Sequence, residues 1–302
     1  MDMNTLYELL ERAQNRDHKA TIAIAHGTDR DVLQAALTAV SKGIASVRIT
    51  GPKQEILQQL NELGGKADGE MIKIEPTTDE GESVKRAVEL VRNEEADVVM
   101  KGMVSTSHLL KVVLNKENGI RSSSVLSHVA LFQHPIEHRL MFVTDAAMNI
   151  SPGIDEKVAI VGNAVQIAHK VGMDCPKVAA LAAVETVNPS MQATVDAAVL
   201  AQMNARNQIS GCVVDGPLAL DNAINIQAAE HKGIQSSVAG SADILFVPTI
   251  EVGNVLYKSL VYFSRANVAS VIAGSKAPIV LTSRADSAEN KLFSIALAIC
   301  SA

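Results

Sequence analysis

The chain lacks the features that mark secreted, membrane-spanning or nucleic-acid-binding proteins. Its 302 residues include three cysteines, no tryptophan and only 3% aromatic residues. Cys175, Cys212 and Cys300 lie far apart without CxxC spacing and form at most one disulfide, as is typical of a protein in the reducing cytoplasm. No uncharged apolar run reaches the roughly 18 residues that a membrane span needs, and the charged first segment does not resemble a signal peptide.

Charge and length narrow the class of protein further. The 33 acidic and 27 basic residues give a net charge of −6 without any block of like charge, which argues against a nucleic-acid-binding surface. The 47% hydrophobic content is enough for a large core, and at roughly 150 residues per domain the length predicts two domains. We therefore expect a globular protein in which any anion site is small and local.

Short β-branched runs alternate with longer segments of helical periodicity along most of the chain. This alternation predicts mainly parallel sheets with helices on both faces, in two α/β/α domains. Runs 129–132 and 140–143 are separated by a short polar link, which predicts an antiparallel hairpin near a domain start. The predicted domains are residues 1–127 with 272–302, and residues 128–271. The other expected strands are 21–25, 47–50, 97–100, 178–181, 212–214, 244–247, 269–272 and 279–281, and the expected helices are 30–42, 52–63, 108–114, 156–171, 191–205, 222–231, 252–265 and a last one to 302.

In such folds, ligands bind beyond the carboxyl ends of the strands, and four loops there carry candidate residues. The first loop, 101–106, follows a strand and opens a helix. Its glycine, main-chain amides and lysine favour an anion, although helix capping explains its hydroxyl groups equally well. It lacks the GxxxxGK[ST] pattern of a Walker A motif. Its candidate binding residues are Lys101, Gly102, Ser105 and Thr106.

The second and third loops, 215–221 and 248–254, combine carboxylate, glycine and amide side chains. Asp215 either orients a substrate or binds turn amides, and the residues alone favour the turn. Glu251 suits a helix N-terminus, whereas glycine and asparagine are poor residues for the helix interior that follows it. The candidate binding residues of these loops are Asp215, Gly216, Pro217, Glu251, Gly253, Asn254 and Lys258.

The fourth loop reads TSRADS from residue 282 and precedes the last predicted helix. Arg284 offers a planar guanidinium to a phosphate or an oxyanion. Asp286, Glu289 and Asn290 are spaced to share one helical face. A surface ion-pair cluster explains these charges about equally well.

Taken in order, KGMVST, VDGPLALD, VPTIEVGNVLYK and the Ser-Arg segment before the last helix resemble the phosphate acetyl/butyryltransferase family, from about Thr21 to Ala302. The resemblance implies two α/β/α domains with a cleft between them, as in isocitrate and isopropylmalate dehydrogenases, and a homo-oligomer. It also implies reversible transfer of a short acyl group between coenzyme A and inorganic phosphate. The expected partners are acyl-CoA, CoA and phosphate, with no permanently bound cofactor and no metal, nucleic acid or membrane.

One departure from the family pattern decides between its branches. The acetyl-transferring branch has an aspartate six positions after the arginine, proposed as the base for the CoA thiol, and Asn290 occupies that position here. The residues present instead look like the butyryl-transferring branch, with the acetyl-transferring branch as the alternative. The resemblance gives Arg284 and Ser283 the role of holding phosphate, and Asp286 or Glu289 that of handling the thiol proton, in a ternary complex without a covalent enzyme intermediate.

Two other classes of function stay open at this point. A nicotinamide-dependent dehydrogenase of similar architecture would need clustered aspartates for a divalent ion, and Asp145, Asp215 and Asp221 are scattered along the chain. A non-catalytic protein that senses CoA or phosphate could keep Arg284 and lack turnover.

Overall fold

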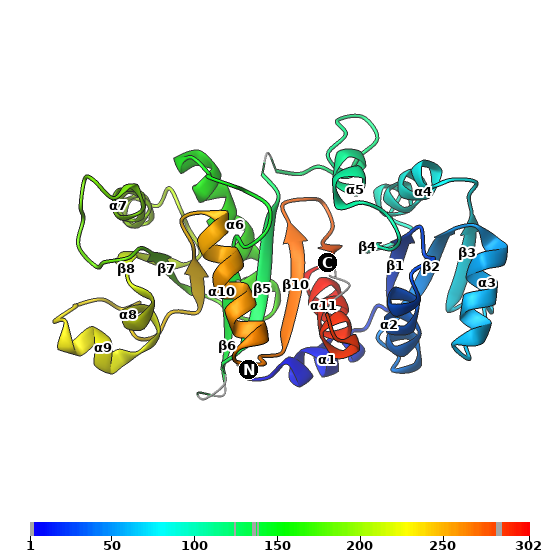
Figure 1. Cartoon of the computed structure of the whole chain (residues 1–302), viewed down its shortest axis with the longest axis horizontal. Helices are drawn as coiled ribbons and strands as arrows, with labels where there is room; N and C mark the ends of the chain where they lie inside the picture. Colours follow the sequence, from blue (N-terminus) through cyan, green and yellow to red (C-terminus); the bar gives the residue numbers. More distant parts are fainter. Residues whose placement is uncertain (1–2, 124, 135–136, 138, 282–285) are drawn as a thin grey trace. The chain divides into compact units, whose positions relative to one another are not determined.

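The computed structural model divides into two compact units (Figure 1), the terminal unit, Leu6–Ser124 with Val268–Ala302, and the middle unit, essentially Val125–Asn267. The predicted domain boundaries stay a prediction, because compactness alone does not show that a unit folds independently. The residues that the structure describes are 3–123, 125–134, 137, 139–281 and 286–302.

The terminal unit contains strands in the order β3-β2-β1-β4-β11-β10. These strands pair in parallel except for β10 with β11. The strands are β1 (Ala20–Ala25), β2 (Ala45–Gly51), β3 (Ile72–Pro76), β4 (Val98–Lys101), β10 (Val268–Ala273) and β11 (Ile279–Val280). The helices are α1 (Leu6–Gln14), α2 (Arg30–Ser41), α3 (Lys53–Glu62), α4 (Glu80–Arg92), α5 (Thr106–Val113) and α11 (Ala288–Ser301).

The middle unit contains strands in the order β5-β6-β9-β7-β8. The predicted antiparallel hairpin is confirmed as β5 with β6, while the other pairs are parallel. The mainly parallel α/β class predicted from the alternation is therefore also confirmed. The strands are β5 (Ser127–Gln133), β6 (Leu140–Thr144), β7 (Lys177–Leu181), β8 (Val213–Leu218) and β9 (Ile244–Phe246). The helices are α6 (Ile154–Lys170), α7 (Gln192–Ala205), α8 (Leu220–Ile224), α9 (Ile226–His231) and α10 (Ile250–Tyr262).

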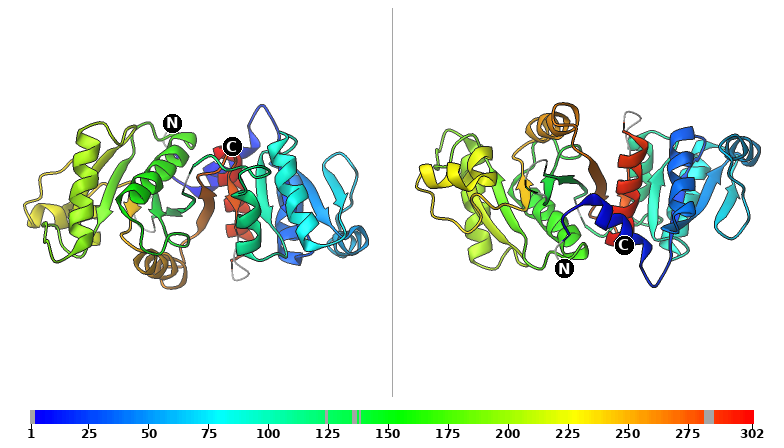
Figure 2. Two further views of the ribbon diagram at one scale, coloured as in Figure 1. Left: turned by 90° about the horizontal axis from the view of Figure 1, so that it is seen from above. Right: turned by 90° about the horizontal axis from the view of Figure 1, so that it is seen from below.

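The core of the terminal unit lies where α11 packs on β10. Every residue of β10 is buried, and so is every residue of α11 from Asn290 to Ser301. A helix that is apolar around most of its circumference must be covered on several sides. Helices α1 and α2 and strand β10 provide that cover, and Figure 2 shows α1 beside α11.

Two sequence predictions of elements were wrong in ways that affect candidate residues. The predicted helix 222–231 is two short helices, because Asn225 has an extended backbone and its side chain caps α9. The predicted strand 212–214 instead runs as β8 to Leu218 and therefore contains Asp215. Strand β3 and helix α4 have no counterpart among the predicted elements.

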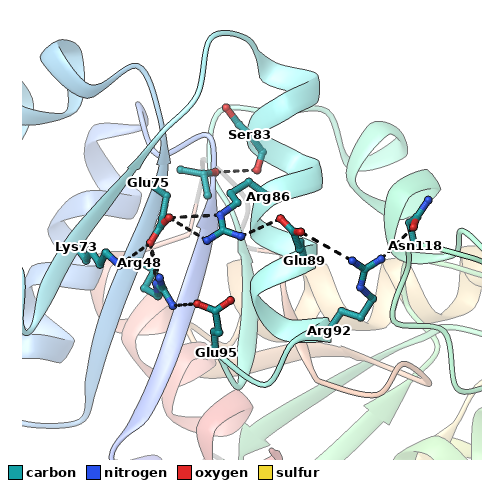
Figure 3. Close-up of polar contacts among 10 residues, drawn as sticks. Arg48, Lys73, Glu75, Ser83, Arg86, Glu89, Arg92, Glu95 and Asn118 are labelled. Carbon is teal, nitrogen blue, oxygen red and sulfur yellow. Dashed lines mark hydrogen bonds and ion pairs between the residues drawn. The ribbon is translucent and has the colours of Figure 1, made fainter.

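An ion-pair network joins β2, β3 and α4 in the terminal unit (Figure 3). Arg48 donates to Glu75 at 3.0 Å, and Arg86 donates to the other oxygen of Glu75 at 3.1 Å and to Glu89 at 2.8 Å. These arginine contacts hold the pKa of Glu75 below its ordinary value although burial acts in the opposite direction. Both guanidinium groups therefore hold strand β3 and helix α4 together and are already occupied by carboxylates.

No helix among the described residues is long and apolar enough to cross a membrane.

Candidate active site

Two of the four predicted loops leave adjacent strands of the terminal unit. Strands β4 and β11 pair in parallel, with Met100 opposite Val280, so that their carboxyl ends lie at the same edge of the sheet. The loop 101–106 begins at this edge after β4, and Leu281 leads from β11 toward the Ser-Arg segment. Pairing between strands far apart in the sequence thus brings the start of the first loop and Leu281, the residue that follows β11, to the same edge. Ser283 and Arg284 themselves lie outside the described residues.

The chain that enters α11 differs from the prediction that Asp286, Glu289 and Asn290 share a helical face. Ser287 caps the helix by accepting a hydrogen bond from the Asn290 amide, and the helix begins at Ala288. Asp286 therefore precedes the helix. Its main-chain oxygen accepts a hydrogen bond of 2.9 Å from the ammonium of Lys291, whose side chain is only 3% exposed. This contact anchors the segment just before α11.

Glu289 is held by the first helix of the chain. It lies on the exposed side of α11, where its carboxylate accepts a hydrogen bond from the hydroxyl of Tyr7 in α1. This hydrogen bond raises the pKa of Tyr7 above its ordinary value. A carboxylate that is already used in this way is less available to take a proton from a substrate.

Asn290 has a structural role in this fold. Its side chain is buried, and its Oδ1 accepts a hydrogen bond of 3.1 Å from the main-chain N–H of Val268 at the start of β10. In this chain, the residue at the position of the acetyl-branch base, Asn290, therefore joins α11 to β10 by a hydrogen bond.

Replacing Asn290 with alanine should lower the free energy of unfolding by about 1–3 kcal/mol, because the buried Val268 N–H loses its acceptor. Urea unfolding of the full chain measures the change, and Asn61→Ala on the exposed face of α3 is the matched control. Equal stability of the two variants would show that the hydrogen bond contributes nothing.

The loop after β4 is tightly packed against the end of β1. The amide of Gly102 donates to the carbonyl of Ala25, and the amide of Met103 donates to the carbonyl of His26. A Cβ on Gly102 would lie 2.3 Å from the His26 carbonyl oxygen, so only glycine allows this close approach. The amide of Val104 donates to the carbonyl of Gly102. These three amides thus already donate hydrogen bonds within the protein. An anion at this loop must therefore contact other groups of the loop.

The three candidate side chains of this loop, those of Lys101, Ser105 and Thr106, have different surroundings. The Lys101 ammonium donates to the carbonyls of Gly102 and Val104 at 3.2 and 3.1 Å, which orders the loop from within. Ser105 is the N-cap of α5 and accepts from the His108 amide, as capping predicts. Thr106 is the exposed first residue of that helix.

His26 is a candidate that the sequence analysis missed. It directly follows β1 at the same sheet edge and has a left-handed backbone with φ of 56°, which is uncommon for a residue other than glycine. Its Nδ1 lies 3.0 Å from the hydroxyl of Ser83, which in turn lies 2.7 Å from the hydroxyl of Thr77. The rule that flagged the four loops, a polar residue just after a parallel strand, also applies to it.

In the middle unit, the motif around Asp215 lies within strand β8. The Asp215 carboxylate accepts a hydrogen bond of 2.8 Å from the amide of Gly216, and the Gly216–Pro217 peptide is cis. A Cβ on Gly216 would lie 2.7 Å from the carbonyl oxygen of Ala180 in β7. Gly216 is thus required for close strand packing, and Asp215 binds a local amide as the turn interpretation predicted.

The glycine and asparagine of α10 position that helix on the turn after β6. A Cβ on Gly253 would lie 2.5 Å from the carbonyl oxygen of Asp145, and Asn254 donates to the carbonyl of Ala146 at 3.3 Å. The Asp145 carboxylate accepts hydrogen bonds from main-chain amides of its turn, including those of residues 147, 148 and 149. Close packing of the helix on this turn explains why Gly253 and Asn254, which are unfavourable in a helix interior, occur here.

Glu251 and Lys258 are exposed on α10. The Glu251 carboxylate accepts hydrogen bonds from the Glu251 main-chain amide and from the Thr249 hydroxyl. These hydrogen bonds hold the pKa of Glu251 below its ordinary value. Beside the helix is an apolar groove of about 770 Å³ at the carboxyl ends of β7 and β9. Glu251 contributes the one carboxylate of its lining, which comprises Leu181, Ala182, Ala183, Ala193, Leu220, Pro248, Glu251, Val252, Val255, Leu256 and Ser259.

The cysteines are poorly suited to act as nucleophiles. Burial raises the pKa of Cys212 and of Cys300 to about 11, so both remain thiols at neutral pH. Cys175 is exposed. Among the described residues, no three histidine, cysteine or acidic side chains form a group that could hold a metal ion.

The fold defines an α/β protein in which two loops with candidate residues, 101–106 and 248–254, follow parallel strands, where ligands bind in such folds. The family described as phosphate acetyl/butaryl transferase matches residues 76–299. The chain belongs to this family, and the predicted family is confirmed.

Similar proteins cover nearly the whole chain. A Bacillus subtilis protein named "Probable phosphate butyryltransferase" is 57% identical over 98% of this chain and 97% of its own length. The phosphate butyryltransferase of Clostridium beijerinckii is 47% identical over 96% of this chain and 95% of its own length. The phosphate acetyltransferase of Thermotoga maritima is 41% identical over 97% and 98%.

Among solved structures, a branched-chain phosphotransacylase from Enterococcus faecalis is 36% identical, with a TM-score of 0.82 over 93% of this chain and 98% of that one. The match extends across both units of the chain in sequence, and it agrees with the family assignment.

Proposed function

We propose that the protein transfers a short acyl group, butyryl in preference to acetyl, reversibly between coenzyme A and inorganic phosphate. Greater identity to relatives named phosphate butyryltransferase than to one named phosphate acetyltransferase supports this choice. Asn290 supports it independently, because a buried amide bound to a main-chain N–H cannot act as the base of the acetyl-transferring branch.

The structural observation that carries the proposal is the parallel pairing of β4 with β11. It brings the start of the loop 101–106 and Leu281, which precedes the Ser-Arg segment in the sequence, to one sheet edge. In the direction of acyl phosphate formation, a phosphate oxygen attacks the thioester carbonyl carbon, the C–S bond breaks and CoA leaves as a thiolate. Arg284, assisted by Ser283, holds the phosphate and offsets the negative charge that develops on the carbonyl oxygen.

The reverse direction requires a base for the CoA thiol. The thiol proton must leave before sulfur attacks the acyl phosphate, and free thiols have a pKa near 8.5. Asp286 is the preferred base in this proposal, because its carboxyl group precedes the helix on the segment that carries Arg284, whereas Glu289 is bound to Tyr7. Direct transfer in a ternary complex also agrees with the raised pKa values of the two buried cysteines.

Other candidate residues have supporting roles in the proposal. Lys101 and Gly102 shape the loop through their contacts with its carbonyls and with β1, and Ser105 and Thr106 present hydroxyl groups at the start of α5. In the middle unit, Gly216, Pro217, Gly253 and Asn254 shape the edge of the sheet, and Asp215 is the reserve candidate for proton transfer. CoA acts here as a substrate, and the cytoplasm is the proposed location because the chain has few cysteines.

The test is release of CoA from acyl-CoA by the purified chain, followed with a thiol reagent. We expect release that requires inorganic phosphate and is faster with butyryl-CoA than with acetyl-CoA at equal concentrations. Equal or reversed rates would move the chain to the acetyl-transferring branch. No release from either thioester would favour a protein that only senses CoA or phosphate, and reduction of NAD with a hydroxy acid would favour a dehydrogenase.

A further inference from the structure

His26 lies at the point in the sheet of the terminal unit where the strand order reverses. The chain runs from β1 outward to β2 and β3, and then places β4 on the other side of β1. Because Ala25 pairs with Lys101, the carboxyl ends of β1 and β4 lie side by side. In doubly wound α/β sheets, ligands bind beyond the carboxyl ends of the strands at this switch point. As the first residue after β1, His26 is placed where a side chain meets such a ligand.

The main chain of His26 is fixed in an unfavourable conformation. Its φ of 56° lies in the left-handed region, which is uncommon for residues other than glycine. The His26 amide donates to the Thr50 hydroxyl at 3.1 Å, and the His26 carbonyl accepts from the amides of Thr28 and Met103 at 2.9 and 2.8 Å. Backbone outliers that their surroundings hold in this way cluster at active sites and ligand sites.

The hydrogen bonds of Ser83 determine which ring nitrogen of His26 carries the proton. The fully buried Ser83 hydroxyl has one proton and lies 2.7 Å from the main-chain carbonyl of Asp79, which can only accept a hydrogen bond. Ser83 therefore donates to Asp79 and accepts hydrogen bonds from its other two partners. These are the hydroxyl of Thr77 at 2.7 Å and Nδ1 of His26 at 3.0 Å. Nδ1 of His26 accordingly carries a proton.

Nε2 of the neutral His26 ring is therefore a hydrogen-bond acceptor. Within the part of the chain that the structure describes, Nδ1 is the ring nitrogen with a hydrogen-bond partner, and the side chain is half-buried. An acceptor at a ligand-binding edge favours a ligand that donates a proton. Inorganic phosphate keeps at least one P–OH group at neutral pH, whereas sulfate is fully ionised and has no proton to donate.

We propose that Nε2 of His26 accepts a hydrogen bond from the P–OH group of bound inorganic phosphate and thereby selects phosphate over sulfate. The inference rests on the proposed function for the phosphate site, and it adds a residue that none of the four candidate loops contains. A guanidinium such as that of Arg284 attracts both ions, because it offers only donors. Sulfate leaves the His26 acceptor unpaired, which lowers its affinity. His26 thus supplies a discrimination that positive charge alone cannot.

Phosphorus NMR tests this selection without any turnover. Broadening of the inorganic phosphate signal by the full chain at neutral pH measures phosphate binding, and its reversal by added sulfate measures sulfate binding. The wild-type protein should bind phosphate at least about tenfold more tightly than sulfate, because a site with an unpaired acceptor rejects the ion without a proton.

His26→Asn removes Nε2 with little other change. The asparagine amide can still donate to Ser83, and asparagine is among the residues that tolerate a left-handed backbone. The preference for phosphate should fall to about twofold or less in this variant. His18→Asn is the matched control, because His18 precedes β1 at the opposite edge of the sheet and its side chain is 77% exposed. It should keep the wild-type preference.

Ser83→Ala tests whether the proton on Nδ1 of His26 sets the selection. Without the Ser83 acceptor, the proton can occupy Nε2 instead, and the preference for phosphate should fall by about threefold or more. Thr77→Val is the control, because it removes a hydroxyl from the same network and leaves the contact between Ser83 and His26 in place. It should keep the preference, which a merely structural role of the network would not separate from the effect of Ser83→Ala.

Circular dichroism establishes that each variant is folded. A wild-type protein that binds both ions equally or binds neither, or a folded His26→Asn variant that keeps the preference, would overturn the proposal. If His26→Asn does not fold, an unchanged preference in Ser83→Ala overturns it instead.

Release of CoA from butyryl-CoA separates this inference from the proposed function. Phosphate-dependent release together with unchanged selection in His26→Asn contradicts only the role of His26. Selection of phosphate by the wild-type protein without any release contradicts acyl transfer and leaves the role of His26 in binding intact.

Discussion

Replacement of Arg284 by alanine is expected to lower turnover of butyryl-CoA with phosphate by about 100-fold or more, the effect of losing a charged group that stabilises a developing oxyanion. The guanidinium offers two parallel N–H donors to phosphate, which a shorter neutral side chain cannot replace. Steady-state release of CoA at saturating phosphate measures the effect on kcat, and a phosphate titration measures the effect on KM.

Two further variants show whether charge or geometry matters at this position. Arg284→Lys keeps the charge without the planar fork, and we expect an intermediate rate. Arg206→Ala, at the exposed end of α7, is the matched control and should leave the rate unchanged. An Arg284→Ala variant that melts at the wild-type temperature and retains near-normal turnover would show that another group holds the phosphate.

Removal of the carboxylate at Asp286 is expected to slow the reaction that consumes CoA thiol by about 100- to 10,000-fold, the range for a positioned general base. The amide in Asp286→Asn keeps the size of the side chain and loses the proton affinity. The loss should appear in kcat and should remove the limb of the pH profile that reports the base. The variant should be measured with butyryl phosphate and CoA over a range of pH.

Glu289→Gln is the comparison that tests the choice of base. Because Glu289 accepts a hydrogen bond from Tyr7 on the exposed side of α11, its replacement should alter stability by about 1 kcal/mol or less and leave the pH profile intact. Tyr7→Phe removes the same hydrogen bond from the other side and should have a similarly small effect. If Glu289→Gln rather than Asp286→Asn abolishes the limb of the pH profile that reports the base, the two roles are reversed. If neither single variant nor the double variant changes the profile, Asp215 becomes the candidate base.

The alternation of β-branched runs with helical segments was enough to predict the class of fold and many of its elements. The antiparallel pairing of β5 with β6 was predictable because a short polar link leaves no room for a crossover. Local capping rules also predicted that a hydroxyl group of the loop 101–106 caps the next helix, and Ser105 does so, since a cap needs only residues within one turn. Four motifs in fixed order identified the family.

Several roles depended on contacts that no local pattern contains. Asn290 binds the main chain of Val268, and Glu289 binds Tyr7, which is 282 residues away in the sequence. Helical spacing predicted that both side chains share one face with Asp286, but the cap at Ser287 starts the helix later and leaves Asp286 outside it. Gly253 is explained only by the carbonyl of Asp145 lying where its Cβ would be.

The sequence by itself determined most of the strands and helices, though not β3 and α4, because hydrophobic period and turn chemistry are local properties. Only the tertiary structure decided which strands lie side by side. The parallel pairing of β4 with β11 brings the start of the loop 101–106 and Leu281 to one edge. The amides of Gly102, Met103 and Val104 donate hydrogen bonds to carbonyls within the protein. Strand order and hydrogen-bond partners depend on the packing of the whole unit, so residue spacing alone could not reveal them.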